Sequence, residues 1–149
     1  MDDVDAFVAE VEPLLRQEVE ALHRGDLGPR LALWSRRDPI TLFGAWLTGR
    51  GWDEIEPAFR RLAATFKGSG GIAYEVLSAG ASGDLGYVVG IERSVATLGD
   101  LGPTSYALRV TTILRREDGA WKVIHRHADP FDPAAAEALG AAAGSLPST

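Results

Sequence analysis

The chain has 149 residues, of which 46% are hydrophobic and 24% are charged, and its formal net charge is −6 at pH 7. This length and composition are typical of one globular domain with its own hydrophobic core. The negative charge disfavours nucleic acid and anionic membranes as partners, and the absence of cysteine excludes disulfides and a cysteine nucleophile. No apolar run approaches the roughly 18 residues of a membrane span, and the N-terminal residues are acidic, so we expect a cytoplasmic protein.

Three segments in the first half of the chain carry hydrophobic residues at helical spacing. The predicted helices are 3–24, 29–35 and 52–67, and the glycine-rich run 67–71 is predicted to end the last of them. Pro13 lies inside the first helix and predicts a kink or a break, because proline removes a backbone donor and crowds the preceding turn. Between the second and third helices we expect a short strand, 40–43, and a glycine-punctuated loop, 44–51.

After residue 71 the hydrophobic period changes to two, which indicates strands. The predicted strands are 72–81, 85–97, 106–116 and the run that follows the Asp118-Gly119 turn and ends at Asp129. Asp-Gly between two such runs is a strong hairpin signal, and the short connections predict an antiparallel meander. Helices followed by strands indicate an α+β domain over residues 1–131, and we expect 132–149 to be a flexible tail rich in Ala, Gly and Pro.

The predicted strands look apolar on both faces. Neither face of the strand 106–116 is polar throughout, as a face open to solvent would be. The helices can cover one face, so the other needs a partner, and a symmetric homodimer is the commonest solution. A large domain that buries both faces itself is the alternative. A strongly curved sheet closed by helices forms a cone, whose open end is a natural small-molecule cavity.

Several stretches of the chain resemble one known superfamily. They are Asp-Pro-Ile-Thr-Leu-Phe-Gly at 38–44, the helix start Gly51-Trp52-Asp53, the strand segment Gly90-Ile91-Glu92-Arg93 and the final run 118–127. Together they resemble the nuclear transport factor 2-like (NTF2-like) superfamily and, within it, the SnoaL-like and ketosteroid-isomerase-like proteins of bacteria. The resemblance spans roughly residues 3–129.

The resemblance implies a particular architecture. Three N-terminal helices pack on a strongly curved antiparallel sheet, which has a short first strand and a four-stranded meander. The family's cone encloses a hydrophobic pocket, and its members dimerise through the outer sheet face. The resemblance does not imply one activity, because the superfamily includes isomerases, polyketide cyclases, dehydratases and association domains.

The catalytic residues of the steroid isomerases are not matched in this chain. Their general-base position falls at Phe43 or Gly44, and their first-helix tyrosine falls near Glu18. Their partner acid falls at Thr111 or Thr112. The proton shuttle of those enzymes is therefore not predicted here.

Four residues are candidates for acid/base catalysis. By analogy with the cyclases, Asp38 or Glu92 would serve as a pocket acid, with a paired structural role for Glu92 as the alternative. His125 and His127 are two residues apart on a strand, so they point to the same face, and imidazole suits acid/base work near neutral pH. A hydrogen-bonded structural pair is the alternative reading. A metal site would need a third ligand, and we predict no metal and no cofactor.

The alternation of the last strand divides its residues between two faces. Trp121 and Val123 share the parity of the two histidines, whereas Ile124 and Arg126 have the opposite parity. Only one of these sets can face the cone.

Five residues are candidates for contacting a ligand. They are Phe43, Trp46, Tyr87, Arg109 and Arg126. If both arginines face the cone, they would bind a carboxylate or another oxyanion, and pairing with Glu92 or Asp38 is the alternative. We therefore expect a pocket for a small hydrophobic or carboxylate-bearing molecule. Acid/base isomerisation or cyclisation of a carbonyl-bearing substrate is the catalytic hypothesis, and a non-catalytic binding or dimeric association domain is the alternative.

Overall fold

The computed structural model describes residues 2–45 and 47–131, which form three helices packed on one curved sheet. The helices are α1 (Asp3–His23), α2 (Gly28–Leu33) and α3 (Trp52–Thr65). The strands are β1 (Thr41–Phe43), β2 (Thr48–Arg50), β3 (Phe66–Ser82), β4 (Leu85–Leu98), β5 (Pro103–Glu117) and β6 (Ala120–Pro130). The sheet order is β2-β1-β6-β5-β4-β3, and only the β1–β6 pair is parallel within these residues.

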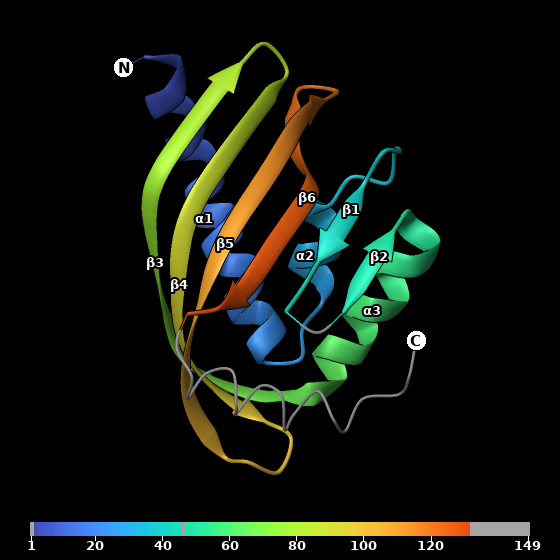
Figure 1. The fold of residues 1–149 in the computed structure, drawn as a ribbon, viewed down its shortest axis with the longest axis vertical. Helices are drawn as coiled ribbons and strands as arrows, with labels where there is room; N and C mark the ends of the chain where they lie inside the picture. The colour runs from blue at the N-terminus through green and yellow to red at the C-terminus, as the bar shows by residue number, and fades with distance from the viewer. Residues whose placement is uncertain (1, 46, 132–149) are drawn as a thin grey trace.

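The architecture confirms the predicted α+β cone. In Figure 1 the long strands β3 to β6 run side by side and curve around α1, while α3 lies beside β2 at the other end of the sheet. Aromatic side chains pack edge to face in the core between the helices and the sheet, such as Phe7 against Trp121 with ring centroids 4.8 Å apart. The predicted tail, 132–149, lies outside the described residues.

Helix α1 is continuous through Pro13, so the predicted break of this helix is not present. The helix begins with a capping bond, in which the Asp5 N–H donates to Oδ1 of Asp2 at 2.7 Å. One proline removes only one backbone donor, whereas the helix buries a long stripe against the sheet. The buried stripe includes Phe7, Val11, Leu15, Glu18, Val19, Leu22 and His23.

Residues 67–71 were predicted to end the third helix, with the next strand starting at residue 72, but α3 already ends at Thr65 and β3 begins at Phe66, directly after it. The glycines lie at irregularities of the strand. The β3–β4 register shifts between Phe66 and Gly68 and between Ser69 and Gly71. Such bulges bend a strand and increase its twist, which suits the narrow end of a cone. The predicted loop 44–51 likewise contains β2, which pairs antiparallel with β1.

A bulge in β6 decides which side chains face the cone. Ile113 of β5 is paired with His125 and the next residue, Leu114, with Val123, so Ile124 has no partner of its own. An unpaired extra residue interrupts the alternation of a strand. As a result Val123 and Arg126 are both buried, whereas His125 is half-buried on the opposite face. The predicted common face of Trp121, Val123 and the two histidines is therefore wrong.

Candidate functional site

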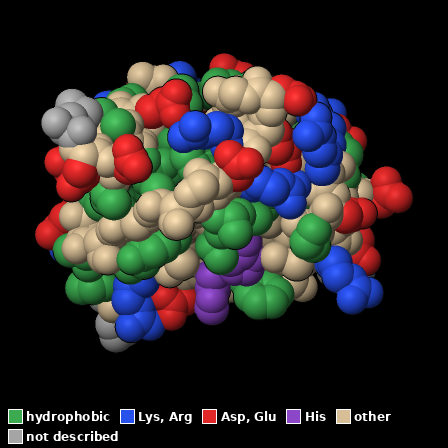
Figure 2. All heavy atoms as spheres, turned by 90° about the horizontal axis from the view of Figure 1, so that it is seen from above, with side chains coloured by type: hydrophobic (Ala, Val, Ile, Leu, Met, Phe, Trp, Pro, Cys, Tyr) green, Lys and Arg blue, Asp and Glu red, His purple; other side chains and the backbone are tan. Residues whose placement is uncertain are grey.

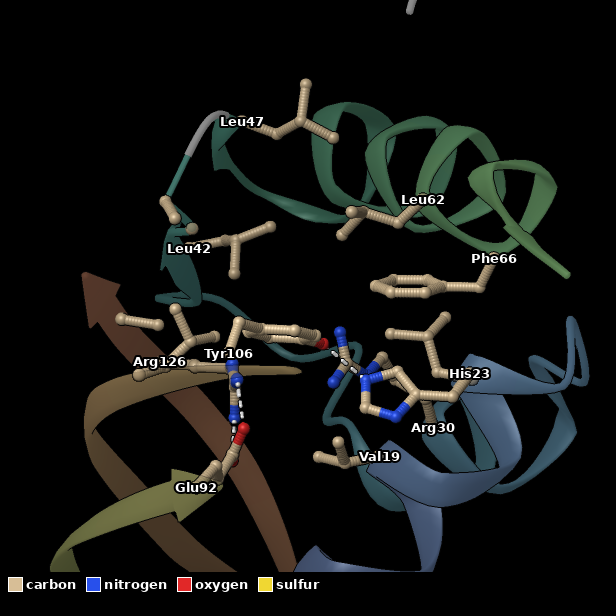
Figure 3. A pocket seen from close by; sticks show the side chains of 15 residues that line it. Val19, His23, Arg30, Leu42, Leu47, Leu62, Phe66, Glu92, Tyr106 and Arg126 are labelled. Carbon is tan, nitrogen blue, oxygen red and sulfur yellow. Dashed lines mark hydrogen bonds and ion pairs between the residues drawn. The ribbon is translucent and has the colours of Figure 1, made fainter. Parts of the chain in front are cut away.

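A small cavity of about 50 Å³ lies inside the cone, between the helices and the inner face of the sheet. Its apolar wall comes from α1, α3, the β1–β2 segment, the start of β3, β5 and the end of β6. It includes Val19, Leu22, Leu42, Leu47, Leu62, Phe66, Leu108 and Ala128. Its polar groups are His23, Arg30, Glu92, Tyr106 and Arg126. Figure 3 shows the ring of Tyr106 crossing the middle of this group, with its hydroxyl pointing to His23.

Glu92 on β4 and Arg126 on β6 form a buried, bidentate ion pair. Nη1 and Nη2 of Arg126 donate to the two carboxylate oxygens at 2.8 and 3.0 Å. The residues are only 1% and 8% exposed. Burial by itself would raise the pKa of Glu92, but the charge and hydrogen bonds of Arg126 lower it overall. Burial likewise disfavours the charged Arg126, but Glu92 outweighs it and raises the arginine pKa. Both groups are charged at neutral pH, so Glu92 does not supply a proton there.

A second buried ion pair joins α1 to α2. Nε of Arg30 donates to Oε2 of Glu18, and Nη2 of Arg30 donates to Oε1 at 3.2 Å. Both side chains are almost fully buried. The Arg30 guanidinium also lies 5.0 Å from the ring centre of Phe59. The two pairs act on each other, because Arg30 contributes to the lowered pKa of Glu92. Two carboxylates and two guanidiniums thus cancel within one buried cluster.

His23 on α1 and Tyr106 on β5 form the uncharged part of the site. Nε2 of His23 lies 2.5 Å from the Tyr106 hydroxyl oxygen. Burial lowers the pKa of His23 to about 4, with Arg30 and Arg126 adding to the shift and Glu92 opposing it. Burial raises the pKa of Tyr106. At neutral pH the site therefore holds a neutral imidazole and a protonated phenol.

Of the predicted site residues that the structure describes, only Glu92 and Arg126 line the cavity. Arg126 does not stand free to bind an oxyanion, because it pairs with Glu92, as the alternative interpretation predicted. Arg109 was predicted to bind an oxyanion with Arg126 if both face the cone, and this condition is not met. Arg109 lies exposed on the outer face, where it forms a bidentate pair with Asp129 at 3.0 and 2.5 Å.

The other predicted residues lie outside the cavity or outside the described chain. Phe43 and Tyr87 are 48% and 43% exposed, and Asp38 is also exposed. His125 and His127 lie on the outer face, because of the bulge at Ile124. The placement of Trp46 is not described. Five predicted pocket residues therefore lie outside the cavity: Phe43, Tyr87, Asp38, His125 and His127.

The two outer histidines form a small cluster with strand β1. The ring of Phe43 lies edge-on to His125 and His127, with centroids 5.3 and 5.5 Å away. Nδ1 of His125 lies 2.7 Å from the Thr41 hydroxyl. Burial lowers the pKa of His125, a hydrogen bond with the Thr41 backbone opposes this, and the charge of His127 adds to the lowering. Figure 2 shows histidine side chains at the surface beside hydrophobic ones.

Sequence reasoning missed Glu18, His23 and Arg30 as site residues. A signal for the first two was present: they fall on the same helical stripe as Leu15, Val19 and Leu22. A polar side chain on a buried stripe needs a hydrogen-bond partner. Burying it unpaired costs about 1–3 kcal/mol for a neutral group and more for a charged one. Arg30 carried no such signal, because α2 has only six residues.

Residues 2–45 and 47–131 contain neither a candidate metal site nor a membrane-spanning helix. Within these ranges no group of three or more His, Asp or Glu side chains is placed to hold a metal ion. No helix described in these ranges is both long enough and apolar enough to cross a membrane.

The comparisons with known proteins agree with this architecture. The model of the SnoaL-like domain family matches residues 11–131. Comparison with curated proteins finds no significant match. Among solved structures, the fold is similar to that of a candidate dehydratase of the NTF2-like family from Streptomyces avermitilis, with a TM-score of 0.67 and 21% identity, covering 86% of this chain and 98% of that one.

Two further structures give the same picture. An NTF2-like protein of unknown function from Pseudomonas putida aligns with a TM-score of 0.65 and 25% identity, over 87% of this chain and 90% of the other. A candidate calcium/calmodulin-dependent protein kinase type II association domain from Thiobacillus denitrificans aligns with a TM-score of 0.61 and 21% identity, over 82% and 93%. With the family model covering most of the chain and the cone fold present, this protein belongs to the SnoaL-like domain family of the NTF2-like superfamily.

Proposed function

We propose that this domain binds a small, mainly hydrophobic molecule in the cavity of the cone. The observation that carries the proposal is the cavity itself, an apolar-walled space with a few converging polar groups at its base. This combination is the usual form of a small-molecule site in proteins. Membership of the SnoaL-like domain family supports the same reading.

The volume of the cavity limits the size of the ligand in this conformation. It is about 50 Å³, whereas a cavity of roughly 150 Å³ is known to hold benzene. Molecules of a few heavy atoms fit without a change in the walls. A larger ligand requires movement of wall side chains such as Leu47 and Leu62, which lie opposite Tyr106 in Figure 3.

Acid/base chemistry on a carbonyl-bearing ligand is the catalytic extension of this proposal. It is supported by the His23–Tyr106 pair, which places a neutral imidazole and a phenol of raised pKa at the cavity. A phenol that stays protonated can donate to a developing oxyanion, as isomerisation, cyclisation and dehydration require. The fold neighbour described as a candidate dehydratase is compatible with this class of reaction.

Cavity-filling variants test the binding proposal. Acetone, a ketone of four heavy atoms, is added to the wild type, to Ala128→Leu, which fills the cavity, and to Ala120→Leu, an exposed control on the same strand. We expect the ketone to raise the Tm of the wild type and of Ala120→Leu but not of Ala128→Leu. Equal effects on all three proteins would show that binding occurs elsewhere.

A separate experiment tests the catalytic extension. The open-chain ketone pent-4-en-2-one is added to the same three proteins, and its conversion to the conjugated pent-3-en-2-one is followed by ultraviolet absorbance.

As a second function, we propose homodimerisation through the outer face of the sheet. The observation favouring it is an apolar stretch across three strands, formed by side chains that no helix covers. These side chains are Phe43, Tyr87, Val89, Ile91 and Ile113, with Leu77 beside them on β3. The neighbour described as an association domain has the same fold.

Charge on the outer face also favours a second copy as the partner. Arg109 pairs with Asp129, and Arg93 pairs with Glu75 at 2.8 Å, so these four charges are compensated within the chain. A second copy of the same surface therefore meets no net repulsion, despite the overall charge of −6.

Light scattering after size-exclusion chromatography tests the dimer. We expect the mass of two chains for the wild type and of one chain for Val89→Asp, which places a charge in the centre of the outer face. Leu14→Asp introduces the same charge on an exposed position of α1, away from this face, and should remain dimeric. A wild type of single-chain mass at high concentration would contradict this second function.

A further inference from the structure

We propose that the cavity takes an uncharged molecule with a hydrogen-bond-accepting oxygen, and that Tyr106, positioned by His23, donates the hydrogen bond to it. This inference rests on the proposed binding function and names its ligand class. It narrows the sequence-based expectation, which also included carboxylate-bearing molecules.

The exclusion of charged ligands follows from the two buried ion pairs. Every guanidinium nitrogen of Arg126 that faces Glu92 is engaged in a bidentate bond, and Arg30 is engaged with Glu18 in the same way. Nη1 of Arg30 takes no part in these bonds, but the charge of that guanidinium is already balanced by Glu18. A carboxylate ligand beside it would add an uncompensated negative charge to a buried cluster whose net charge is zero, which is strongly unfavourable. A cationic ligand would likewise add an uncompensated positive charge, because both carboxylates are already paired with guanidiniums.

The direction of the hydrogen bond between His23 and Tyr106 follows from the other ring nitrogen. Nδ1 of His23 is buried and makes no hydrogen bond to any described residue. A neutral imidazole carries one proton. If the proton were on Nδ1, an N–H would be buried without an acceptor, which is rarer and more costly than an acceptor without a donor. The proton is therefore assigned to Nε2, which donates to the Tyr106 oxygen.

This assignment leaves the Tyr106 hydroxyl proton free to bind a ligand. A phenol has one proton, and it is not used on His23 when Nε2 donates. The side chain lines the cavity between Leu42 and Leu62 on one side and Arg126 on the other (Figure 3). His23 thus acts as a positioning residue, which holds the phenol oxygen and directs its O–H elsewhere.

Ser94 is a second buried hydroxyl beside Tyr106. The two residues are paired across β4 and β5, and a side-chain hydrogen bond with Ser94 lowers the pKa of Tyr106 against the larger effect of burial, although its geometry is not that of a standard hydrogen bond. A hydrogen bond that lowers a phenol pKa is one that the phenol oxygen accepts. Ser94 does not line the cavity, so it supports the Tyr106 oxygen and leaves the Tyr106 proton for a ligand.

Three small probes of equal heavy-atom count test the ligand class. They are acetone, acetate and isopropylammonium, which differ in charge but little in shape. Each is titrated into the full chain at neutral pH and followed by nuclear magnetic resonance of the Tyr106 and His23 side chains. We expect saturable shifts with acetone and none with the two ions. Acetate binding as tightly as acetone would overturn the ligand class while leaving the binding function intact. If none of the probes shifts these signals, both the inference and cavity binding fail for molecules of this size.

A matched pair of tyrosine variants tests the donor. Tyr106→Phe removes the hydroxyl from the cavity, and Tyr87→Phe removes one from the outer face. Loss of one neutral hydrogen bond should weaken acetone binding roughly two- to tenfold in Tyr106→Phe and leave it unchanged in Tyr87→Phe. Equal affinity in both variants would remove Tyr106 from the site.

The nitrogen resonances of His23 give an independent test that does not need a ligand. Nitrogen chemical shifts typical of a proton on Nε2 would support the positioning role of His23. Shifts typical of a proton on Nδ1 would overturn it, because Tyr106 would then donate its proton to Nε2.

Discussion

Val123 and Arg126 lie on the same buried face of β6 although three positions separate them, because Ile124 between them has no partner on β5. In a regular strand, residues three apart point to opposite faces. The bulge therefore brings Arg126 to Glu92 inside the cone and turns His125 and His127 outward. One backbone irregularity decides which basic residues belong to the cavity and which belong to the outer surface.

Deletion of Ile124 should leave the Glu92–Arg126 ion pair in place. Without the extra residue, Val123 is followed directly by His125, so regular alternation still turns His125 outward and Arg126 inward, opposite the same residues of β5. The cost of the deletion should therefore be close to that of Ile124→Ala, which removes the same partly buried side chain and keeps the bulge. Urea unfolding followed by circular dichroism measures both. An extra loss of about 3–5 kcal/mol in the deletion variant, as for an uncompensated buried charge, would contradict the role given to the bulge.

Breaking the buried Glu92–Arg126 ion pair by removing one member should lower the free energy of unfolding more than replacing both members. Arg126→Met leaves Glu92 buried and unpaired, so we expect a loss of about 3–5 kcal/mol in the free energy of unfolding. The double change Glu92→Leu with Arg126→Met removes both charges and should recover most of that loss. Arg109→Met breaks an exposed pair with Asp129 and should cost at most about 1 kcal/mol. A double variant no more stable than the single one would show that the charges are themselves stabilising.

His23 should make the stability of the protein depend on pH in mildly acidic solution. Burial lowers its pKa in the folded state from the ordinary histidine value of 6.5 to about 4, so between these pH values the unfolded chain binds a proton that the folded chain does not. Stability therefore falls as the pH falls through this window, by roughly 3 kcal/mol in total.

Two histidine variants isolate this effect. His23→Gln removes the titrating group from the core and should flatten the pH dependence between pH 4 and 6.5. His127→Gln makes the same change at an exposed histidine of the outer face and should leave the slope in place. Thermal unfolding at a series of pH values distinguishes them, and an unchanged slope in His23→Gln would contradict the assignment.

Protonation of His125 should weaken the proposed homodimer. Its ring would be buried between two copies, and burial disfavours the charged imidazole. The facing groups are Thr41 and Phe43 of β1, Thr111 and Ile113 of β5, and Asp129 of β6, whose carboxylate is engaged by Arg109.

Analytical ultracentrifugation measures this pH dependence. We expect the dimer dissociation constant to rise as the pH falls below the ordinary histidine pKa of about 6.5, because burial lowers the pKa of His125 from that value. His125→Asn should lose this dependence. A dissociation constant that does not change with pH in the wild type would place His125 outside the interface.

Much of the fold could be predicted from local patterns in the sequence. Helical spacing located α1 and α3, the change to period two located β4 and β5 closely, and Asp118-Gly119 marked the last hairpin. These signals are local, because they depend on side chains a few positions apart. The early start of β3 was not predictable in this way, because the glycines of 67–71 are typical of loops unless neighbouring strands hold them.

The site could be predicted only in part, because its members come from α1, α2, β4, β5 and β6. Composition, spacing and the resemblance were enough for an α+β cone with an internal pocket, and for Glu92 paired with Arg126 as one open reading. Tertiary structure alone decided that His23 joins Tyr106, that Glu18 joins Arg30, and that His125 faces outward. The physical reason is that a buried polar side chain is satisfied by a partner distant in sequence, and one unpaired residue, Ile124, reverses the face of every side chain that follows it.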